Sequence, residues 1–217
     1  MRVLVWNVHG FRAGSRRVAA AVEALRPDLA LLNEVGVLGF RLSRFAGRMG
    51  RRAVSGLRVR RHIPNAVLVR EPLRVVSAGL ARFPDPGERT RRGAAIVVVG
   101  RGDERLTAVS VHLGLVDPRR PRDARALLAG LEAQGGRAIV GGDLNEGPDM
   151  PAAELFASGL TDAFAAAGEG GGLTFPAREP RARIDYLFVS RDIGVERAWV
   201  IPTTASDHLP LVADLSL

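Results

Sequence analysis

The chain has 217 residues, of which 47% are hydrophobic and 25% charged, with a formal net charge of +8 at pH 7; this composition is usual for a folded globular protein. It contains no cysteine, which excludes disulfides, thiolate metal sites and a cysteine nucleophile, so any metal must be bound through oxygen or imidazole groups. No apolar run approaches the roughly 18 to 20 residues that a membrane-spanning helix requires.

The length suits one hydrophobic core, and we expect residues 1–217 to form a single domain. The first strand-like segment begins almost at Met1 and leaves no room for a signal sequence, so we expect a cytoplasmic protein. We also expect a monomer. The positive charge would suit a polyanionic partner such as nucleic acid or an anionic lipid surface. All 31 basic residues are arginine, however, and such a compositional bias weakens this signal.

Strand-like and helix-like segments alternate along the chain, which favours a layered α/β or α+β fold. The first half predicts a strand at residues 2–6, a helix from Ser15 with Val18, Val22 and Leu25 on one face, a strand at residues 29–35, a helix with Leu38, Leu42, Phe45 and Met49 on one face, and strands at residues 65–69, 73–78 and 94–99. The spacing of the strands after residue 53 favours antiparallel connections.

The second half predicts a strand at residues 106–111, then a helix for which Asp117 and Pro118 are a typical N-cap and first turn and which Gly135 ends. Further elements are a strand at residues 138–140, a short helix at 152–156, a glycine-rich stretch at 168–172, and strands at 184–189, 195–200 and 211–215.

Polar side chains recur where the predicted strands end, which is where functional sites are usually built. Each has an ordinary explanation when taken alone: Asp143 and Asn145 could form a turn through their own backbone, and a lone His112 is more often a satisfied core histidine than a catalytic one. Glu34 is harder to dismiss, because a buried carboxylate without a partner costs several kcal/mol. The set consists of Asn7, Glu34, His112, Asp143, Asn145, Asp185, Asp207 and His208.

The ordered set resembles the endonuclease/exonuclease/phosphatase superfamily, which includes deoxyribonuclease-I-like nucleases, abasic-site endonucleases, neutral sphingomyelinases and inositol-polyphosphate 5-phosphatases. The resemblance extends from Asn7 to His208 and is carried by six segments in family order: WNVHG, LLNEVG, SVHLGL, GGDLNEGPD, RIDYLFVS and ASDHLPL. It implies a four-layered α/β sandwich, in which two mixed β-sheets pack face to face with helices on the outside and the site at one edge of the sheets.

The resemblance also implies a role for each residue. Glu34 matches the family's metal-binding glutamate, Asn7 the asparagine that supports metal and phosphate, and Asp207 with His208 the terminal Ser-Asp-His signature. Asp143 and Asn145 match the Asp-x-Asn pair that positions the attacking water and holds the transition-state phosphate. Asp185 matches the aspartate paired with the final histidine, and His112 a histidine of the nuclease and sphingomyelinase branches. One position departs from the pattern, since Asn33 replaces the glutamine that commonly precedes the metal-binding glutamate.

Cleavage of a phosphodiester spreads negative charge over the phosphoryl oxygens, so a site needs a hard cation, fixed donors and a base. The carboxylate oxygens of Glu34 and Asp207 and the amide oxygen of Asn7 or Asn145 suit Mg²⁺, with Mn²⁺ as a substitute. Either Asp143, or His208 oriented by Asp185, could act as the base, and the sequence leaves both open. Among the arginines, those nearest the motifs are the candidates for binding substrate phosphates: Arg92, Arg119 and Arg183.

We therefore expect a Mg²⁺-dependent phosphoester hydrolase acting on nucleic acid as an endonuclease or exonuclease. A phospholipid-headgroup or inositol-phosphate hydrolase on the same fold is the first alternative, because the loops around a shared metal site choose the substrate. A binding module that has lost the chemistry is the second, and the intact set of acidic, amide and imidazole groups argues against it.

Overall fold

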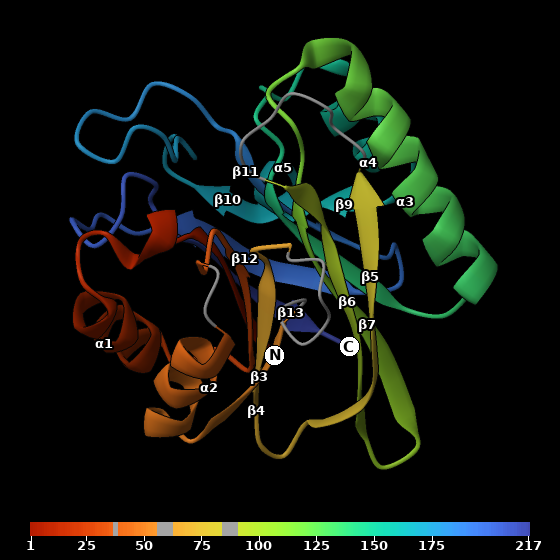
Figure 1. Ribbon diagram of the computed structural model, residues 1–217. Coiled ribbons are helices and arrows are strands. Elements are labelled where there is room, and N and C mark those ends of the chain that lie inside the picture. Colours follow the sequence, from red (N-terminus) through yellow and green to blue (C-terminus); the bar gives the residue numbers. More distant parts are fainter. Residues whose placement is uncertain (37–38, 56–62, 84–90) are drawn as a thin grey trace.

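The computed structural model describes residues 1–36, 39–55, 63–83 and 91–217 of the chain. Over these residues two mixed β-sheets pack face to face, and helices cover their outer faces (Figure 1). The expected four-layered α/β sandwich is thereby confirmed. None of the helices in the described ranges has the length and hydropathy of a membrane span.

Within the described residues, the first sheet has seven strands, in the spatial order β10 (Gly168–Glu169), β12 (Gly194–Val200), β13 (Leu211–Ser216), β1 (Arg2–Asn7), β2 (Leu29–Asn33), β4 (Ala66–Arg70) and β3 (Arg51–Ser55). The second has six, in the order β5 (Arg74–Phe83), β6 (Arg92–Arg101), β7 (Glu104–His112), β8 (Ala138–Asp143), β11 (Asp185–Val189) and β9 (Thr161–Asp162). The parallel pairs β1–β2 and β7–β8 bring the carboxyl ends of these four strands to one edge of the sandwich.

Helices α1 (Ser15–Leu25) and α2 (Gly39–Arg48) pack on the outer face of the first sheet, and α3 (Arg120–Gln134) and α4 (Pro151–Gly159) pack on the outer face of the second (Figure 1). The short helix α5 (Ala163–Ala167) contacts β11 and β12. Two 3₁₀ turns, η1 (His9–Phe11) and η3 (Asp117–Arg119), follow β1 and β7 along the chain.

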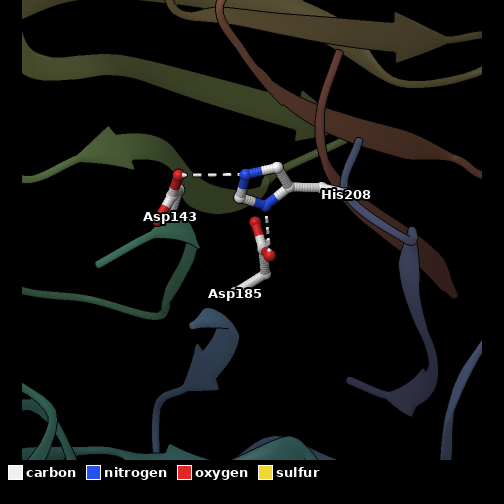
Figure 2. Close-up of side chains that lie close together, drawn as sticks. All are labelled: Asp143, Asp185 and His208. Carbon is white, nitrogen blue, oxygen red and sulfur yellow. Dashed lines mark hydrogen bonds and ion pairs between the residues drawn. The ribbon is translucent and has the colours of Figure 1, made fainter. Parts of the chain in front are cut away.

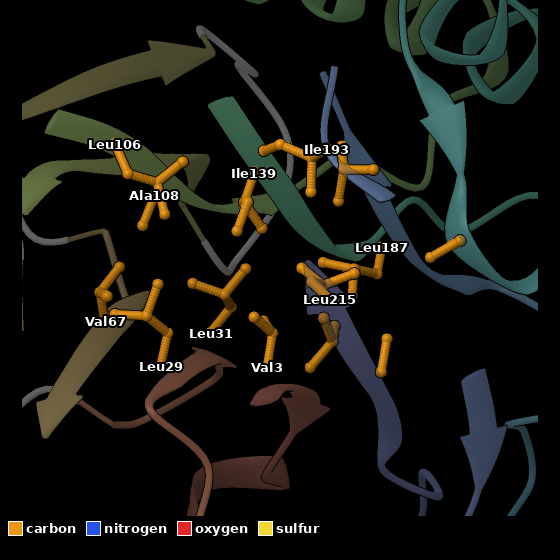
Figure 3. Close-up of a cluster of buried hydrophobic side chains, with 14 of the residues drawn as sticks. Val3, Leu29, Leu31, Val67, Leu106, Ala108, Ile139, Leu187, Ile193 and Leu215 are labelled. Atoms are coloured by element: carbon orange, nitrogen blue, oxygen red, sulfur yellow. The ribbon is translucent and has the colours of Figure 1, made fainter. Parts of the chain in front are cut away.

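The period-2 alternation of the strands divides their side chains between separate hydrophobic clusters. Along β1, Val3 and Val5 point between the sheets, whereas Leu4 and Trp6 pack beneath α1 and α2. Figure 3 shows the cluster between the sheets, in which residues of the first sheet such as Leu29 and Leu31 lie opposite Ala108 and Ile139 of the second. Because both faces of the central strands are buried, these strands read as continuous apolar runs in the sequence.

Several elements differ from the sequence-based expectation. The predicted helix with an N-cap at Asp117 begins instead at Arg120, after the 3₁₀ turn η3, and its N-cap is Arg119. The sequence did not predict β3, β9 or α5, and part of the glycine-rich stretch at 168–172 forms β10. These are short elements or edge strands whose pairing depends on distant parts of the chain. Leu38, expected on the face of α2, lies outside the described residues.

Candidate active site

The inward-facing row of four strands continues past the apolar core and ends in polar side chains at one edge of the sandwich. Along β1 the row reads Val3, Val5 and then Asn7, and along β11 Asp185 is the inward residue two positions before Leu187. Strand register aligns the rest: β7 and β8 pair His112 with Asp143, and β8 and β11 pair Asp143 with Asp185. Strand pairing within the second sheet and packing of the two sheets therefore bring together residues that are up to 178 positions apart in the sequence, from Asn7 to Asp185.

Asp143 is the centre of this group. Its side chain is buried, and its Oδ2 accepts a hydrogen bond from Nδ2 of Asn7 at 3.0 Å. Nε2 of His112 lies 3.3 Å from the same oxygen, and Oδ1 accepts from the backbone N–H of Asn145 at 2.9 Å. This last bond is an Asx turn, so the expected turn at Asp143 and Asn145 does form, inside the site.

Two neighbouring glycines allow close packing directly beneath Asp143, Gly141 against the opposite sheet and Gly142 against the neighbouring strand β7. A Cβ atom on Gly141 would lie 2.5 Å from a methyl carbon of Val5 and 2.9 Å from one of Leu31, both in the opposite sheet. A Cβ atom on Gly142 would lie 1.8 Å from the backbone oxygen of Val111. The two glycines are therefore part of the close-packed end of β8, and the turn begins after them, at Asp143.

Asn33, which stands where the family commonly has glutamine, joins the two sheets behind the site. Its Oδ1 accepts from the backbone N–H of Asp143 at 3.0 Å, and its Nδ2 donates to Ser110 Oγ at 3.1 Å and to the backbone oxygen of Val111 at 2.9 Å. It is fully buried and faces the backbone, not the site. Its role is to hold the end of β8, and with it Asp143, against β2.

The imidazole of His208 lies between two carboxylates (Figure 2). Nδ1 is 2.8 Å from Oδ2 of Asp185, and Nε2 is 3.8 Å from Oδ2 of Asp143. The ring also packs against Phe175, with centroids 4.7 Å apart, and the backbone oxygen of His208 accepts from the indole N–H of Trp6 at 2.9 Å. The predicted pairing of Asp185 with His208 is thus present in the structure.

Burial and neighbouring charges shift the pKa values of His208 and Asp143 in opposite directions. Burial alone would lower the pKa of His208, but the charge and hydrogen bond of Asp185, together with the charge of Asp143, outweigh it and raise the pKa to about 9. Burial would likewise raise the pKa of Asp143, and the imidazoles of His112 and His208 with the amide of Asn7 hold it well below its usual range instead. At neutral pH His208 is a cation and Asp143 an anion.

Glu34 and Asp207 are more exposed than the buried Asp143, Asp185 and His208. Glu34 directly follows β2 with a left-handed backbone conformation, φ 54°, and among the described residues its half-buried carboxylate has no hydrogen-bond or ion-pair partner. The Asp207 side chain is 40% exposed; its Oδ2 is 3.0 Å from Nδ1 of His9, and its Oδ1 is 3.3 Å from Ser206 Oγ. Ser206 Oγ donates to the backbone oxygen of Asn7 at 2.7 Å, which joins this loop to β1.

Among the described residues one group of side chains gathers three possible metal ligands, and the predicted ligands Glu34 and Asp207 are not part of it. Asp143, Asp185 and His208 offer ligand atoms within 4.8 Å of one another, and His208 would release a proton on binding a metal there. The carboxylates of Glu34 and Asp207 are oxygen ligands of the kind that hard divalent cations prefer. The partnerless carboxylate of Glu34 fits a cation, because a half-buried negative charge requires compensation.

Asn145 and Glu146 link the site to the loop after β7. Nδ2 of Asn145 donates to the backbone oxygen of Leu113 at 2.9 Å. The buried carboxylate of Glu146 accepts from Nε of Arg120 at 2.7 Å and from the backbone N–H of Ala153 at 2.7 Å, at the first turn of α4. Arg120 in turn donates to the backbone oxygen of Leu115 at 3.0 Å. This ion pair braces the loop from 113 to 116, and sequence patterns did not identify it.

The three candidate arginines have different surroundings. Arg92 is buried, and its Nη1 contacts both ring nitrogens of His112, at 2.8 Å from Nδ1, so it supports the imidazole that faces Asp143. Arg119 is half-buried at the end of η3. Arg183 donates to both carboxylate oxygens of Asp162, at 2.6 and 3.2 Å, and its guanidinium lies 4.7 Å from the ring centroid of Tyr186. Substrate binding by these arginines remains a prediction.

His9 was not among the expected site residues, although it follows Asn7 by two positions in WNVHG. The structure places its ring against Asp207 and its backbone N–H 3.0 Å from Oδ1 of Asn7. The position of a histidine inside the first motif was the available signal, but it could not reveal a partner 198 residues away.

Comparisons with known proteins agree with this geometry. The model of the endonuclease/exonuclease/phosphatase family matches residues 4–208 of the chain. No curated protein matches at a significant level. The mannosyl-6-phosphatase of Bacteroides thetaiotaomicron has a similar structure, with a TM-score of 0.85 and 18% identity over 100% of both chains.

Two further solved structures share the fold. TDP2 of D. rerio, complexed with a single-strand DNA product, has a TM-score of 0.82 and 15% identity over 100% of this chain and 99% of the other. The human Nocturnin catalytic domain with a bound sulfate anion has a TM-score of 0.78 and 22% identity over 100% and 93%. Members of the matched family are metal-dependent phosphoester hydrolases. With the family model covering nearly the whole chain and the acidic and imidazole groups gathered at one edge of the sandwich, this protein belongs to the endonuclease/exonuclease/phosphatase family and is a phosphoesterase.

Proposed function

We propose that the protein is a Mg²⁺-dependent phosphodiesterase that hydrolyses nucleic acid. The observation that supports the chemistry is the buried carboxylate of Asp143, which Asn7, His112 and the backbone of Asn145 hold in one orientation beside the cationic His208. An anionic acceptor next to a fixed cation is the arrangement that attack of water on a phosphoryl group requires.

The charges favour Asp143 as the anion that orients the attacking water and His208 as the cation. A pKa of about 9 keeps His208 protonated at neutral pH, so its Nε2 can donate to a phosphoryl oxygen but cannot take a proton from water. Asp143 is ionised, and its Oδ2 lies within 3.8 Å of that Nε2. A water molecule oriented by Asp143 would thus lie close to a phosphate held by His208.

We infer that Glu34 and Asp207, with the amide of Asn7 close by, hold the cation. Mg²⁺, or Mn²⁺ in its place, would supply positive charge to the phosphoryl oxygens when bound. Oδ1 of Asn7 already accepts the backbone N–H of His9, so this oxygen can serve the cation only through its second lone pair. Asp143 and Asp185 act instead on the buried side of the site, Asp143 on the attacking water and Asp185 on His208.

Nucleic acid is the proposed substrate class for two reasons. The net charge of +8 favours polyanions, because binding them releases their counterions. TDP2, one of the structural neighbours, was solved with a single-strand DNA product. Phospholipid headgroups and inositol phosphates are the alternative on the same fold, and the mannosyl-6-phosphatase shows that a sugar phosphate also has to be tested.

The deciding experiment offers the purified protein, with Mg²⁺ and after EDTA treatment, a panel of substrates: plasmid DNA, single-stranded and abasic oligonucleotides, phosphatidylinositol phosphates, sphingomyelin and mannose 6-phosphate. We expect Mg²⁺-dependent cleavage of DNA. The Asp143→Asn variant, purified in parallel, controls for contaminating nuclease and should lose roughly a hundredfold in kcat or more. Turnover of a lipid or sugar phosphate alone would overturn the nucleic-acid assignment, and equal activity of D143N and wild type would overturn the mechanism.

A further inference from the structure

The tight turn after β1 touches three of the residues that surround the inferred cation position. The backbone N–H of His9 donates to Oδ1 of Asn7 at 3.0 Å, and that of Gly10 donates to the backbone oxygen of Glu34 at 2.8 Å. Nδ1 of His9 lies 3.0 Å from Oδ2 of Asp207. One turn of the chain therefore connects groups that come from β1, from the end of β2 and from the loop before β13.

His9 has a conformation that serves these contacts. Its φ of 45° is in the left-handed region, where histidine, asparagine and aspartate are the non-glycine residues found most often, and its side chain lies toward Asp207 while its backbone N–H faces Asn7. The His9 and Asp207 side chains are 33% and 40% exposed, so the pair lies on the open side of the site and not in the core. A strained backbone at this place is consistent with a functional constraint.

A carboxylate that binds a metal usually accepts a further hydrogen bond that fixes its orientation. The carboxylate of Asp207 is exposed enough to rotate, and Nδ1–H of His9 holds one of its oxygens while leaving lone pairs on both for a cation. The other ring nitrogen of His9 remains on the far side of the imidazole. No other described side chain except Ser206 contacts this carboxylate.

We propose that His9 is a positioning residue of the metal site, which orients Asp207 through Nδ1 and thereby sets the affinity for the divalent cation. This proposal rests on the proposed function, because it takes Asp207 as a ligand. Its action is on cation binding and not on the water that Asp143 orients.

The test measures cation binding directly on metal-free protein, by titration with Mn²⁺ followed by electron paramagnetic resonance and with Mg²⁺ by calorimetry. The matched variants are His9→Asn and His9→Gln. The amide nitrogen of asparagine lies at nearly the same distance from the backbone as Nδ1, and asparagine tolerates φ near 45°, whereas glutamine places its amide one carbon further out. We expect H9N to bind within about threefold of wild type and H9Q to bind roughly 10- to 100-fold more weakly.

Melting of each variant in EDTA separates this effect from a loss of fold. If H9Q is too unstable to titrate, ¹⁵N spectra of the histidine rings in the wild-type protein provide a second measurement: the Nδ1–H signal of His9 should change in Asp207→Asn and stay in Glu34→Gln. Wild-type cation affinity in H9Q, equal weakening in H9N and H9Q, or an Nδ1–H signal that is indifferent to Asp207, overturns the role of His9.

The same titrations distinguish this failure from failure of the proposed function. Glu34→Gln and Asp207→Asn should each remove most of the cation affinity, because each deletes a ligand charge. If they do so and H9Q does not, the metal site stands and His9 has no part in it. If they bind cations as the wild type does, the site itself lies elsewhere and the positioning role fails with it.

Discussion

Nδ1 of His208 lies 2.8 Å from Oδ2 of Asp185, and both side chains are buried. The second oxygen of that carboxylate, Oδ1, has no hydrogen-bond partner among the described residues, so the negative charge of Asp185 is compensated mainly by the imidazole. This pair makes His208 a cation at neutral pH and fixes the direction in which its Nε2 points.

The Asp185→Asn variant should lower kcat by roughly a hundredfold or more with little change in KM, because the buried imidazole loses the charge that keeps it protonated. Steady-state kinetics on a generic phosphodiester measure this. Asp162→Asn is the control: Asp162 is also a paired carboxylate, but its partners are Arg183 and the first turn of α5. Unchanged kcat in D185N, or an equal loss in D162N, would contradict the assigned role of the pair.

Stability should depend on pH through His208. Its pKa in the folded protein, about 9, is above the ordinary 6.5, so its contribution is complete below pH 6.5 and is lost as the pH rises toward 9. The shift corresponds to about 3 kcal/mol at most. We expect the Tm of the protein in EDTA to fall by several degrees between pH 6.5 and 9, and the fall to be much smaller in His208→Gln. A Tm that is flat in the wild type over this range would show that His208 is not held as a cation.

The pKa shift of Asp143 makes stability depend on pH in the opposite direction. Its pKa lies below the ordinary value of 3.8, so its contribution to stability is present above that pH and is lost only in stronger acid.

Arg119 and Arg183 should respond differently to replacement by alanine. Arg119→Ala is expected to raise KM for DNA and to flatten its salt dependence, with kcat nearly unchanged, if this half-buried arginine contacts phosphate. Arg183→Ala should instead lower the Tm, because the side chain is engaged by Asp162 and Tyr186. Kinetics at several salt concentrations, together with thermal melting, compare the two. A Tm loss without a KM effect in R119A would make Arg119 a structural residue.

Glu146→Gln should destabilise the protein by up to about 3 to 5 kcal/mol, since it removes the buried carboxylate that pairs with the guanidinium of Arg120. Denaturant unfolding measures the loss. Glu179→Gln, which breaks an ion pair between two side chains that are at least 70% exposed, is the matched control and should have no measurable effect. A loss in E146Q no larger than in E179Q would show that the buried pair does not brace the loop after β7.

Most long elements could be predicted from the sequence, because their apolar residues repeat with the period of a strand or of a helix. The continuous apolar run from Val3 to Trp6 and the spacing of Val18 and Val22 identified β1 and α1, with bounds close to those observed. The two-residue strands β9 and β10 could not be predicted, because their pairing partners are in β11 and β12 and no local periodicity marks them.

The candidate site was predictable to the same extent and for a related reason. Asn7, His112, Asp143 and Asp185 stand out because a polar residue interrupts or ends a row that is otherwise apolar. Contacts with residues outside such rows carry no local signal. The pairing of His9 with Asp207, the support of Asp143 by Asn33 and the bracing of the loop by Arg120 and Glu146 all join segments that are distant in the chain.

By itself, the sequence determined most of the long elements, the family to which the chain belongs and the residue types available for phosphoester chemistry, because apolar patterns and ordered motifs can be read locally. Only the tertiary structure decided how charge is distributed among those residues. The pKa of His208 rises because Asp185 and Asp143, at the ends of β11 and β8, are buried against this loop residue, and Asp143 stays ionised because His112 and Asn7 converge on it from opposite sheets. Burial and distance set these energies, and both arise when the two sheets pack together.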